Sequence, residues 1–108
     1  MAVQHFTFAK FRPCLTVQEK EDAYKTVFLL LSAALLLPGI RGFKVGPPID
    51  KKGTRGYEFA VSVEFEDLKS FKEYVLHAHH QLVSDFVFSF SEGTPLSYQI
   101  DTDRVAKL

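Results

Sequence analysis

Residues 57–65, with the sequence YEFAVSVEF, decide how this chain folds. The odd-numbered positions all carry large apolar side chains, and the even-numbered positions carry Glu58, Ala60, Ser62 and Glu64. Because successive side chains of a strand point to opposite faces of the sheet, this alternation predicts a β-strand with one face in the core.

Three further stretches predict strands around this one. Residues 3–11 alternate two sets of side chains, and both sets contain apolar bulk, which predicts a strand covered on both faces. Residues 40–46 form a shorter alternating stretch, and residues 96–101 place Leu96, Tyr98 and Ile100 on one face. The loop at 47–56 is rich in turn residues and charge and has no periodicity.

The segments between these strands predict helices. Thr16 followed by Glu19 forms a capping box, and the helix that it begins ends at Pro38-Gly39. Its second half is apolar on all sides, which predicts that it is covered on every face. A second helix is expected after Asp67, and a second helical segment over residues 79–90.

The second helix is expected to bury one apolar stripe. Leu68, Phe71, Val75 and Ala78 recur at spacings of three and four, with Tyr74 beside this stripe.

The resulting order, β-α-β-β-α-(α)-β, is typical of an α+β protein with a ferredoxin-like antiparallel sheet and helices on one face. A single copy would leave the other sheet face bare, with Phe6, Phe8, Ala60 and Ser62 on it. A second copy packed about a two-fold axis would cover this face, so we expect a homodimer that closes into an α+β barrel.

Length and composition exclude several classes. The 108 residues predict one domain over 1–108. Thirteen basic and thirteen acidic residues give a formal net charge of zero, and no basic stripe occurs, which argues against a nucleic-acid partner. The apolar run at 27–37 is shorter than the roughly 20 residues that span a bilayer, so no membrane association is expected. With one cysteine, Cys14, and no signal-peptide pattern, the chain is expected in the cytoplasm.

Candidate chemistry is concentrated in residues 73–80, EYVLHAHH, which hold three of the four histidines and Tyr74. Histidine changes charge near neutral pH, and a tyrosine hydroxyl can donate or accept a hydrogen bond. A metal site from His77, His79 and His80 is disfavoured because these near neighbours diverge on a helix and no acidic or thiolate partner is evident. The pattern leaves open whether His79 or His80 points inward.

Several blocks of the chain carry a resemblance to a known family. They are Val3-Gln4-His5 with Lys10-Phe11, Leu15-Thr16 with Lys20, Pro38, Gly56-Tyr57, residues 63–66 and, most specifically, residues 73–80. On these residues the chain resembles the dimeric α+β barrel family of stress-responsive A/B barrel, or Dabb, domains. It departs from the usual family pattern at Ala78, where a proline is common, and at the additional His79.

The resemblance to the cyclase branch of this family implies a pocket between the helices and the sheet. His80 would be the catalytic base, Tyr74 would assist it, and His5 would line the same pocket. The remaining positions expected to contact a substrate are Thr7, Ala9, Tyr24, Val27, Phe59, Val61, Val63, His77, Val83, Ser84 and Phe86. No cofactor and no metal are implied.

Two functions follow as alternatives. The first is a cofactor-free cyclase or dehydratase acting on an oxygenated, polyketide-like small molecule, in which His80 removes a proton and Tyr74 and His5 donate hydrogen bonds to the developing oxyanions. The second is a non-catalytic stress or defence dimer that binds apolar ligands. The substrate and its ring chemistry cannot be deduced from the sequence.

Overall fold

The computed structural model describes residues 2–104, so residues 1 and 105–108 of the expected domain lie outside it. Its elements follow in the order β1 (Val3–Ala9), α1 (Val17–Ala34), β2 (Ile40–Gly46), β3 (Phe59–Phe65), α2 (Leu68–Val75), α3 (Ala78–Phe90) and β4 (Leu96–Asp101). The predicted order of strands and helices is therefore confirmed, with α1 ending before Leu37 and β1 before Phe11.

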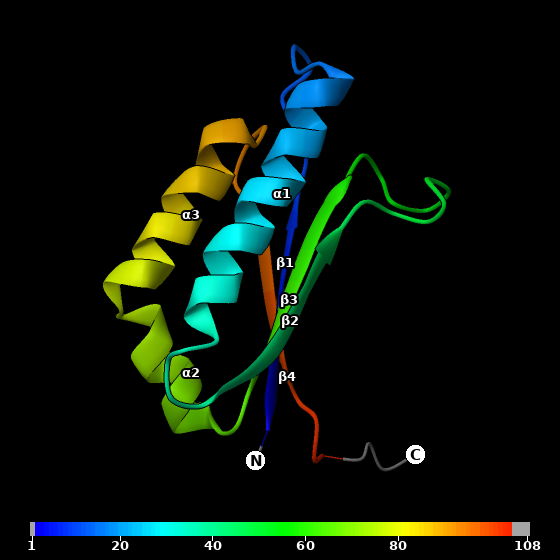
Figure 1. Cartoon of the computed structure of the whole chain (residues 1–108). Coiled ribbons are helices and arrows are strands. Elements are labelled where there is room, and N and C mark those ends of the chain that lie inside the picture. The colour runs from blue at the N-terminus through cyan, green and yellow to red at the C-terminus, as the bar shows by residue number, and fades with distance from the viewer. Residues whose placement is uncertain (1, 105–108) are drawn as a thin grey trace.

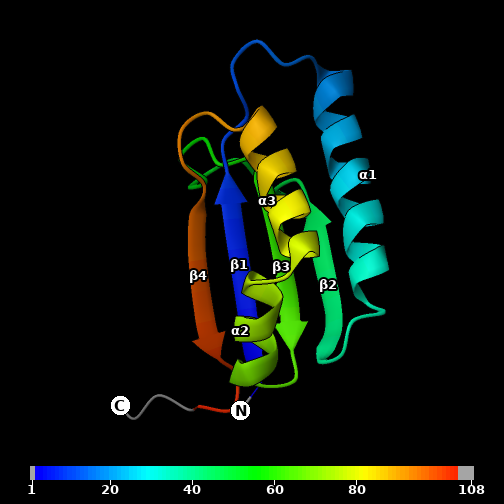
Figure 2. The same cartoon turned by 90° about the vertical axis from the view of Figure 1, so that its left-hand side faces the viewer.

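The four strands form one antiparallel sheet in the order β2-β3-β1-β4. All three helices cover the same face of this sheet, and no helix or strand of residues 2–104 covers the opposite face (Figure 1). Turned by 90°, the molecule shows α1 on the β2 side and α2 and α3 over β1 and β3, whereas β4 extends beyond the helices (Figure 2). This is the ferredoxin-like α+β arrangement that the alternating strands predict.

The strand β3 forms the floor of the core. Phe59, Val61, Val63 and Phe65 are buried, and the residues between them are half-buried. In the antiparallel register His5 pairs with Val63 and Thr7 with Val61, so odd-numbered residues of β1 face the helices as well.

Side-chain caps fix the helix ends. The Thr16 hydroxyl accepts from the Glu19 amide and the Glu19 carboxylate accepts from the Thr16 amide, as the capping box predicts. Asp67 caps α2 by accepting from the Ser70 amide. Gly39 has a positive φ of 83°, and a Cβ there would collide with the Ser70 side chain, so this turn requires glycine.

Two expectations about packing are wrong. The second half of α1 is not covered on every face, because Phe28 is 54% and Leu29 is 69% exposed. In α2 the buried residue is Tyr74, whereas Leu68 and Val75 of the expected stripe are exposed. Both follow from a single sheet face that can cover only one side of each helix.

None of the helices within residues 2–104 is long and apolar enough to cross a membrane.

Candidate functional site

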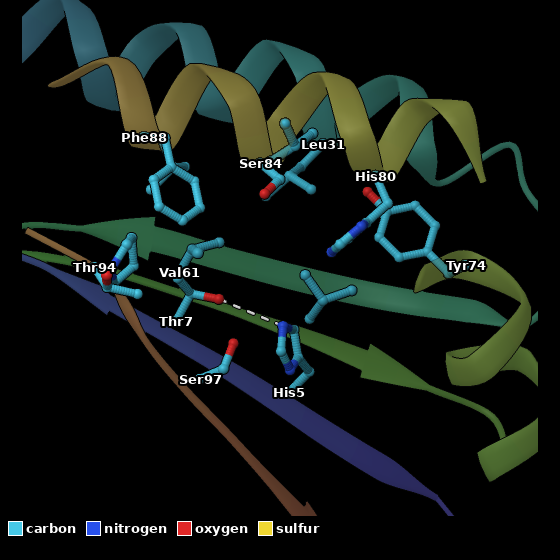
Figure 3. Close-up of a pocket in the computed structure, with 14 residues that line it drawn as sticks. His5, Thr7, Leu31, Val61, Tyr74, His80, Ser84, Phe88, Thr94 and Ser97 are labelled. Atoms are coloured by element: carbon cyan, nitrogen blue, oxygen red, sulfur yellow. Dashed lines mark hydrogen bonds between the residues drawn. The ribbon is translucent and has the colours of Figure 1, made fainter. Parts of the chain in front are cut away.

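A cavity of about 350 Å³ lies between α3 and the sheet. Side chains of α3 point down into it and side chains of β1 and β4 point up, with Tyr74 closing one end (Figure 3). The described residues that line it are His5, Thr7, Leu31, Val61, Val63, Tyr74, His80, Val83, Ser84, Val87, Phe88, Thr94, Pro95 and Ser97. No Asp, Glu, Lys or Arg occurs among these lining residues, so the wall is apolar apart from hydroxyls and two imidazoles.

His80 projects from the first turn of α3 into the cavity (Figure 3). Its ring meets the Tyr74 ring edge-on, with 5.3 Å between centroids. Burial lowers the pKa of His80, a hydrogen bond to the Val75 backbone opposes this shift, and the neighbouring His79 lowers the pKa further. In the neutral ring one of the two nitrogens carries no hydrogen and can accept a proton.

His5 approaches the same cavity from β1. The Gln99 amide nitrogen on β4 donates to His5 Nδ1 over 2.8 Å, so Nε2 carries the hydrogen in the neutral ring. Nε2 lies 3.4 Å from Thr7 Oγ1, inside the cavity (Figure 3). Burial, with a smaller contribution from His80, lowers the pKa of His5 to about 4. The site therefore pairs a proton-accepting imidazole, His80, with a hydrogen-donating one, His5.

The choice between the two adjacent histidines is resolved by geometry. His80 lines the cavity, whereas the ring of His79 lies between the Tyr74 hydroxyl and α1. Tyr74 Oη is 3.0 Å from His79 Nδ1, and His79 Nε2 is 2.7 Å from the Leu30 carbonyl oxygen. Burial raises the pKa of Tyr74 to about 12, so its hydroxyl is protonated at neutral pH.

The side chains of His79 and His80 point in different directions from the first turn of α3, which begins at Ala78 after α2 has ended at Val75. His77 caps α3 and its Nδ1 accepts from the His79 amide over 2.9 Å. Ala78 is the first residue of α3. His77 is exposed and does not line the cavity, contrary to the expectation that it contacts a substrate, because its ring is held at the helix end.

The other predicted contact residues divide into two groups. Thr7, Val61, Val63, Val83 and Ser84 line the cavity together with His5, Tyr74 and His80. Ala9, Tyr24, Val27, Phe59 and Phe86 do not, which corrects the expectation that they line it.

These five residues lie away from the cavity because aromatic rings fill the adjoining part of the core. Phe59 is 1% exposed and packs on Phe11, Tyr24 and Phe90 with centroids 5.0–6.2 Å apart. Phe86 packs on Phe90 in the same cluster, 5.6 Å between centroids. The Tyr24 hydroxyl donates to the Glu58 carbonyl instead of facing a ligand.

Six lining residues were not predicted, namely Leu31, Val87, Phe88, Thr94, Pro95 and Ser97. Helical spacing could have found the first three, because Leu31 follows Val27 by four positions and Val87 and Phe88 follow Val83 and Ser84 by four. Ser97 pairs with Thr7 in the β1–β4 register, which only the sheet order shows. Exposed Phe88, Thr94 and Ser97 place the mouth of the cavity between α3 and β4.

The described residues hold no group of three His, Cys, Asp or Glu side chains placed to bind a metal ion. The site's own groups can accept a proton, donate hydrogen bonds and enclose an apolar molecule.

The lowered pKa of His5 predicts how stability depends on pH. An unfolded histidine binds a proton near pH 6.5 and folded His5 only near about 4, so protons favour the unfolded chain between these values. The free energy of unfolding should fall as pH drops from about 6.5 to about 4, and the His5→Asn variant should lose less over this range. Urea titrations at several pH values would measure both slopes. If the free energy of unfolding had the same pH dependence in wild type and His5→Asn, this would contradict the lowered pKa of His5.

The fold and site define the chain as a ferredoxin-like α+β protein with an internal ligand-sized cavity. A model of the stress responsive A/B barrel domain, Dabb, matches residues 3–97. The chain belongs to this family. Olivetolic acid cyclase from Cannabis sativa is 30% identical over 93 residues, which cover 85% of this chain and 89% of the cyclase.

Solved structures with the same fold are more distant in sequence. A dimeric ferredoxin-like protein of unknown function from Jannaschia sp. CCS1 superimposes with a TM-score of 0.79 at 18% identity, covering 94% of this chain and 99% of that one. An Arabidopsis thaliana protein gives 0.76 at 19% identity, with coverage of 97% and 99%. Hydroxynitrile lyase from Passiflora edulis gives 0.71 at 16% identity, with coverage of 93% and 94%. At these identities the structures show the shared fold alone.

Proposed function

We propose that this protein is a cofactor-free acid–base enzyme that cyclises an oxygenated, polyketide-like small molecule. The observation that carries the proposal is the pair of imidazoles, His80 and His5, facing one cavity with no charged side chain among the described residues of its wall. The similarity to olivetolic acid cyclase over most of both chains supports a cyclase or lyase type of reaction.

The proposed reaction needs only proton transfer and carbon–carbon bond formation. His80 removes an acidic proton from a carbon between two carbonyl groups, and the electron pair of that C–H bond forms an enolate. The enolate carbon attacks a second carbonyl of the same chain, forming a carbon–carbon bond and an alkoxide. The His5 N–H donates a hydrogen bond to the developing oxygen anion, and protonated His80 returns its proton to the alkoxide. The product is an aldol, with no oxidant or reductant required.

The apolar wall contributes orientation. A flexible chain must fold back on itself before two of its carbonyl carbons can react, and confinement in a cavity of about 350 Å³ reduces the entropy lost at that step. Val61, Val83 and Val87 supply this confinement without competing for protons.

Filling the cavity tests whether the reaction occurs there. Ser84→Phe places a ring in the cavity, and it is expected to slow cyclisation of a short synthetic poly-β-ketone by about 10²-fold, since displacing the substrate from its reactive geometry carries a cost of that order. The matched control is Ser89→Phe on the exposed part of α3, which should retain the wild-type rate. Substrate loss and product mass would be followed by chromatography against buffer.

The outcomes separate the two functional alternatives. If the poly-β-ketone cyclised no faster with the wild-type protein than in buffer, this would contradict the proposal that the protein is an enzyme. Tight binding of the poly-β-ketone without turnover would instead favour a non-catalytic stress-related binding protein.

We also propose that the bare sheet face joins two copies of the chain. Phe6 and Phe8 stack there with 6.1 Å between centroids, and their cross-strand partners Tyr98 and Leu96 are 63% and 51% exposed. No element of the described chain covers this face (Figure 1). The Jannaschia protein with the same fold is described as dimeric. An apolar sheet face of this kind is more stable when covered.

A charge on that face should disrupt the dimer. Tyr98→Lys is expected to convert most of the protein to the mass of one chain at micromolar concentration, because an ammonium group would be buried without a partner. Leu36→Lys, on an 89% exposed helix-side position, is the control and should stay dimeric. Light scattering after size exclusion measures the mass. A monomeric wild-type protein would overturn the proposal.

A further inference from the structure

The Tyr74 hydroxyl does not stand alone in the cavity wall. Its oxygen is 3.0 Å from Nδ1 of His79, and Nε2 of the same ring is 2.7 Å from the carbonyl oxygen of Leu30 in α1. All three groups are part-buried. The ring of His79 therefore connects the cavity tyrosine to the backbone of a neighbouring helix.

The chemistry of these groups fixes where the hydrogens lie. A carbonyl oxygen has no hydrogen to donate, so Nε2 of His79 must be the N–H that bonds to Leu30. In a neutral imidazole the other nitrogen is then an acceptor. Nδ1 consequently accepts its hydrogen bond from the Tyr74 hydroxyl, whose single proton points away from the cavity.

We propose that His79 is a positioning residue that makes Tyr74 a hydrogen-bond acceptor toward the cavity, so that this end of the site selects ligands carrying an O–H donor. Tyr74 lines the cavity, and its oxygen keeps its lone pairs while its proton is held by His79. This assignment replaces the expectation that Tyr74 donates to an oxyanion. His5 and the hydroxyls of Thr7 and Ser84 remain as donors elsewhere in the wall. The ligand selectivity rests on the proposed role of the cavity, whereas the position of the protons does not.

The position of the protons can be measured without a ligand. Two-bond proton–nitrogen correlation spectra at about pH 8 should show His79 with hydrogen on Nε2 and none on Nδ1. In Tyr74→Phe the Nδ1 resonance should move toward that of an unbonded ring nitrogen. Hydrogen on Nδ1, or an Nδ1 signal unaffected by Tyr74→Phe, would overturn the proposal.

Matched probes test the selectivity. Wild type should bind 4-propylcyclohexanol about fivefold more tightly than 4-propylcyclohexanone in chemical-shift titrations, which corresponds to one added hydrogen bond. His79→Phe keeps a ring but frees the Tyr74 proton to donate to the ketone, so the preference should fall toward unity. His79→Asn places an oxygen near the position of Nδ1 and should restore the preference for the alcohol. If the His79 ring only filled space, this variant would not restore the preference.

The outcomes are distinguishable. An equal preference in wild type and His79→Phe would overturn the role of His79 in selectivity. If neither probe binds, the proposed function of the cavity fails, and the tautomer measurement still decides whether His79 positions Tyr74.

Discussion

Replacing His80 with glutamine is expected to slow cyclisation of a poly-β-ketone by about 10²- to 10⁴-fold, the usual contribution of a general base. His80 lines the cavity, and one nitrogen of its neutral ring carries no hydrogen and can take a proton. An amide of similar size fills the same space and cannot accept a proton at neutral pH, so the loss should appear mainly in kcat.

The control for this variant is another histidine of the same segment. His77 is exposed at the start of α3 and caps the helix, and His77→Asn keeps a capping side chain. This variant should retain the wild-type rate within about threefold, since it removes no group from the cavity and small changes at capping positions cost about 1 kcal/mol or less. Comparable rates for His80→Gln and wild type would remove His80 from the mechanism.

The second large effect is on stability. Phe65→Ala is expected to lower the free energy of unfolding by about 3–5 kcal/mol, the range measured when large buried aromatic residues are truncated. Phe65 is 0% exposed, and its ring packs on Phe71 and Tyr74 with centroids 5.4 and 5.6 Å away. The cavity left behind would also loosen the support of Tyr74.

Urea unfolding at one fixed protein concentration would measure this change, because the stability of an assembled protein depends on concentration. Phe28→Ala is the matched control, since its ring is 54% exposed and contacts Phe43 at 5.3 Å between centroids. Phe28→Ala should lower the free energy of unfolding by less than half as much as Phe65→Ala. An equal decrease in the free energy of unfolding for the two variants would contradict the prediction that Phe65 contributes more to the stability of the core than Phe28.

Most of the fold could be predicted from local patterns. The alternation at residues 57–65, the capping box at Thr16 and the turn at Gly39 each act over a few residues. The capping box and the turn occur as expected, and the predicted strand forms but begins at Phe59 instead of Tyr57. The exposure of Phe28 and Leu29 could not be predicted in the same way, because hydrophobicity shows that a helix is apolar and does not show how many of its sides a single sheet can cover.

The candidate site was less accessible to sequence reasoning. Residue type and family resemblance identified His5, Tyr74 and His80, and their side chains lie at one cavity. The extent of that cavity depended on which part of the core the aromatic rings fill, and this is decided by packing around Phe59 rather than by any single residue. The different directions of His79 and His80 depend on where α3 begins, since a shift of the helix by one residue would put His79 at the position that His80 occupies.

The alternation along β1 constrains how this protein can diverge. His5 and Thr7 face the cavity, whereas Phe6 and Phe8 face the opposite side of the sheet. Point substitutions can therefore reshape the ligand site while leaving the outer surface unchanged. Inserting or deleting one residue between positions 4 and 8 would exchange the two sets of side chains and damage both surfaces at once. Descendants of this sequence should vary here by replacement and keep the length of the segment constant.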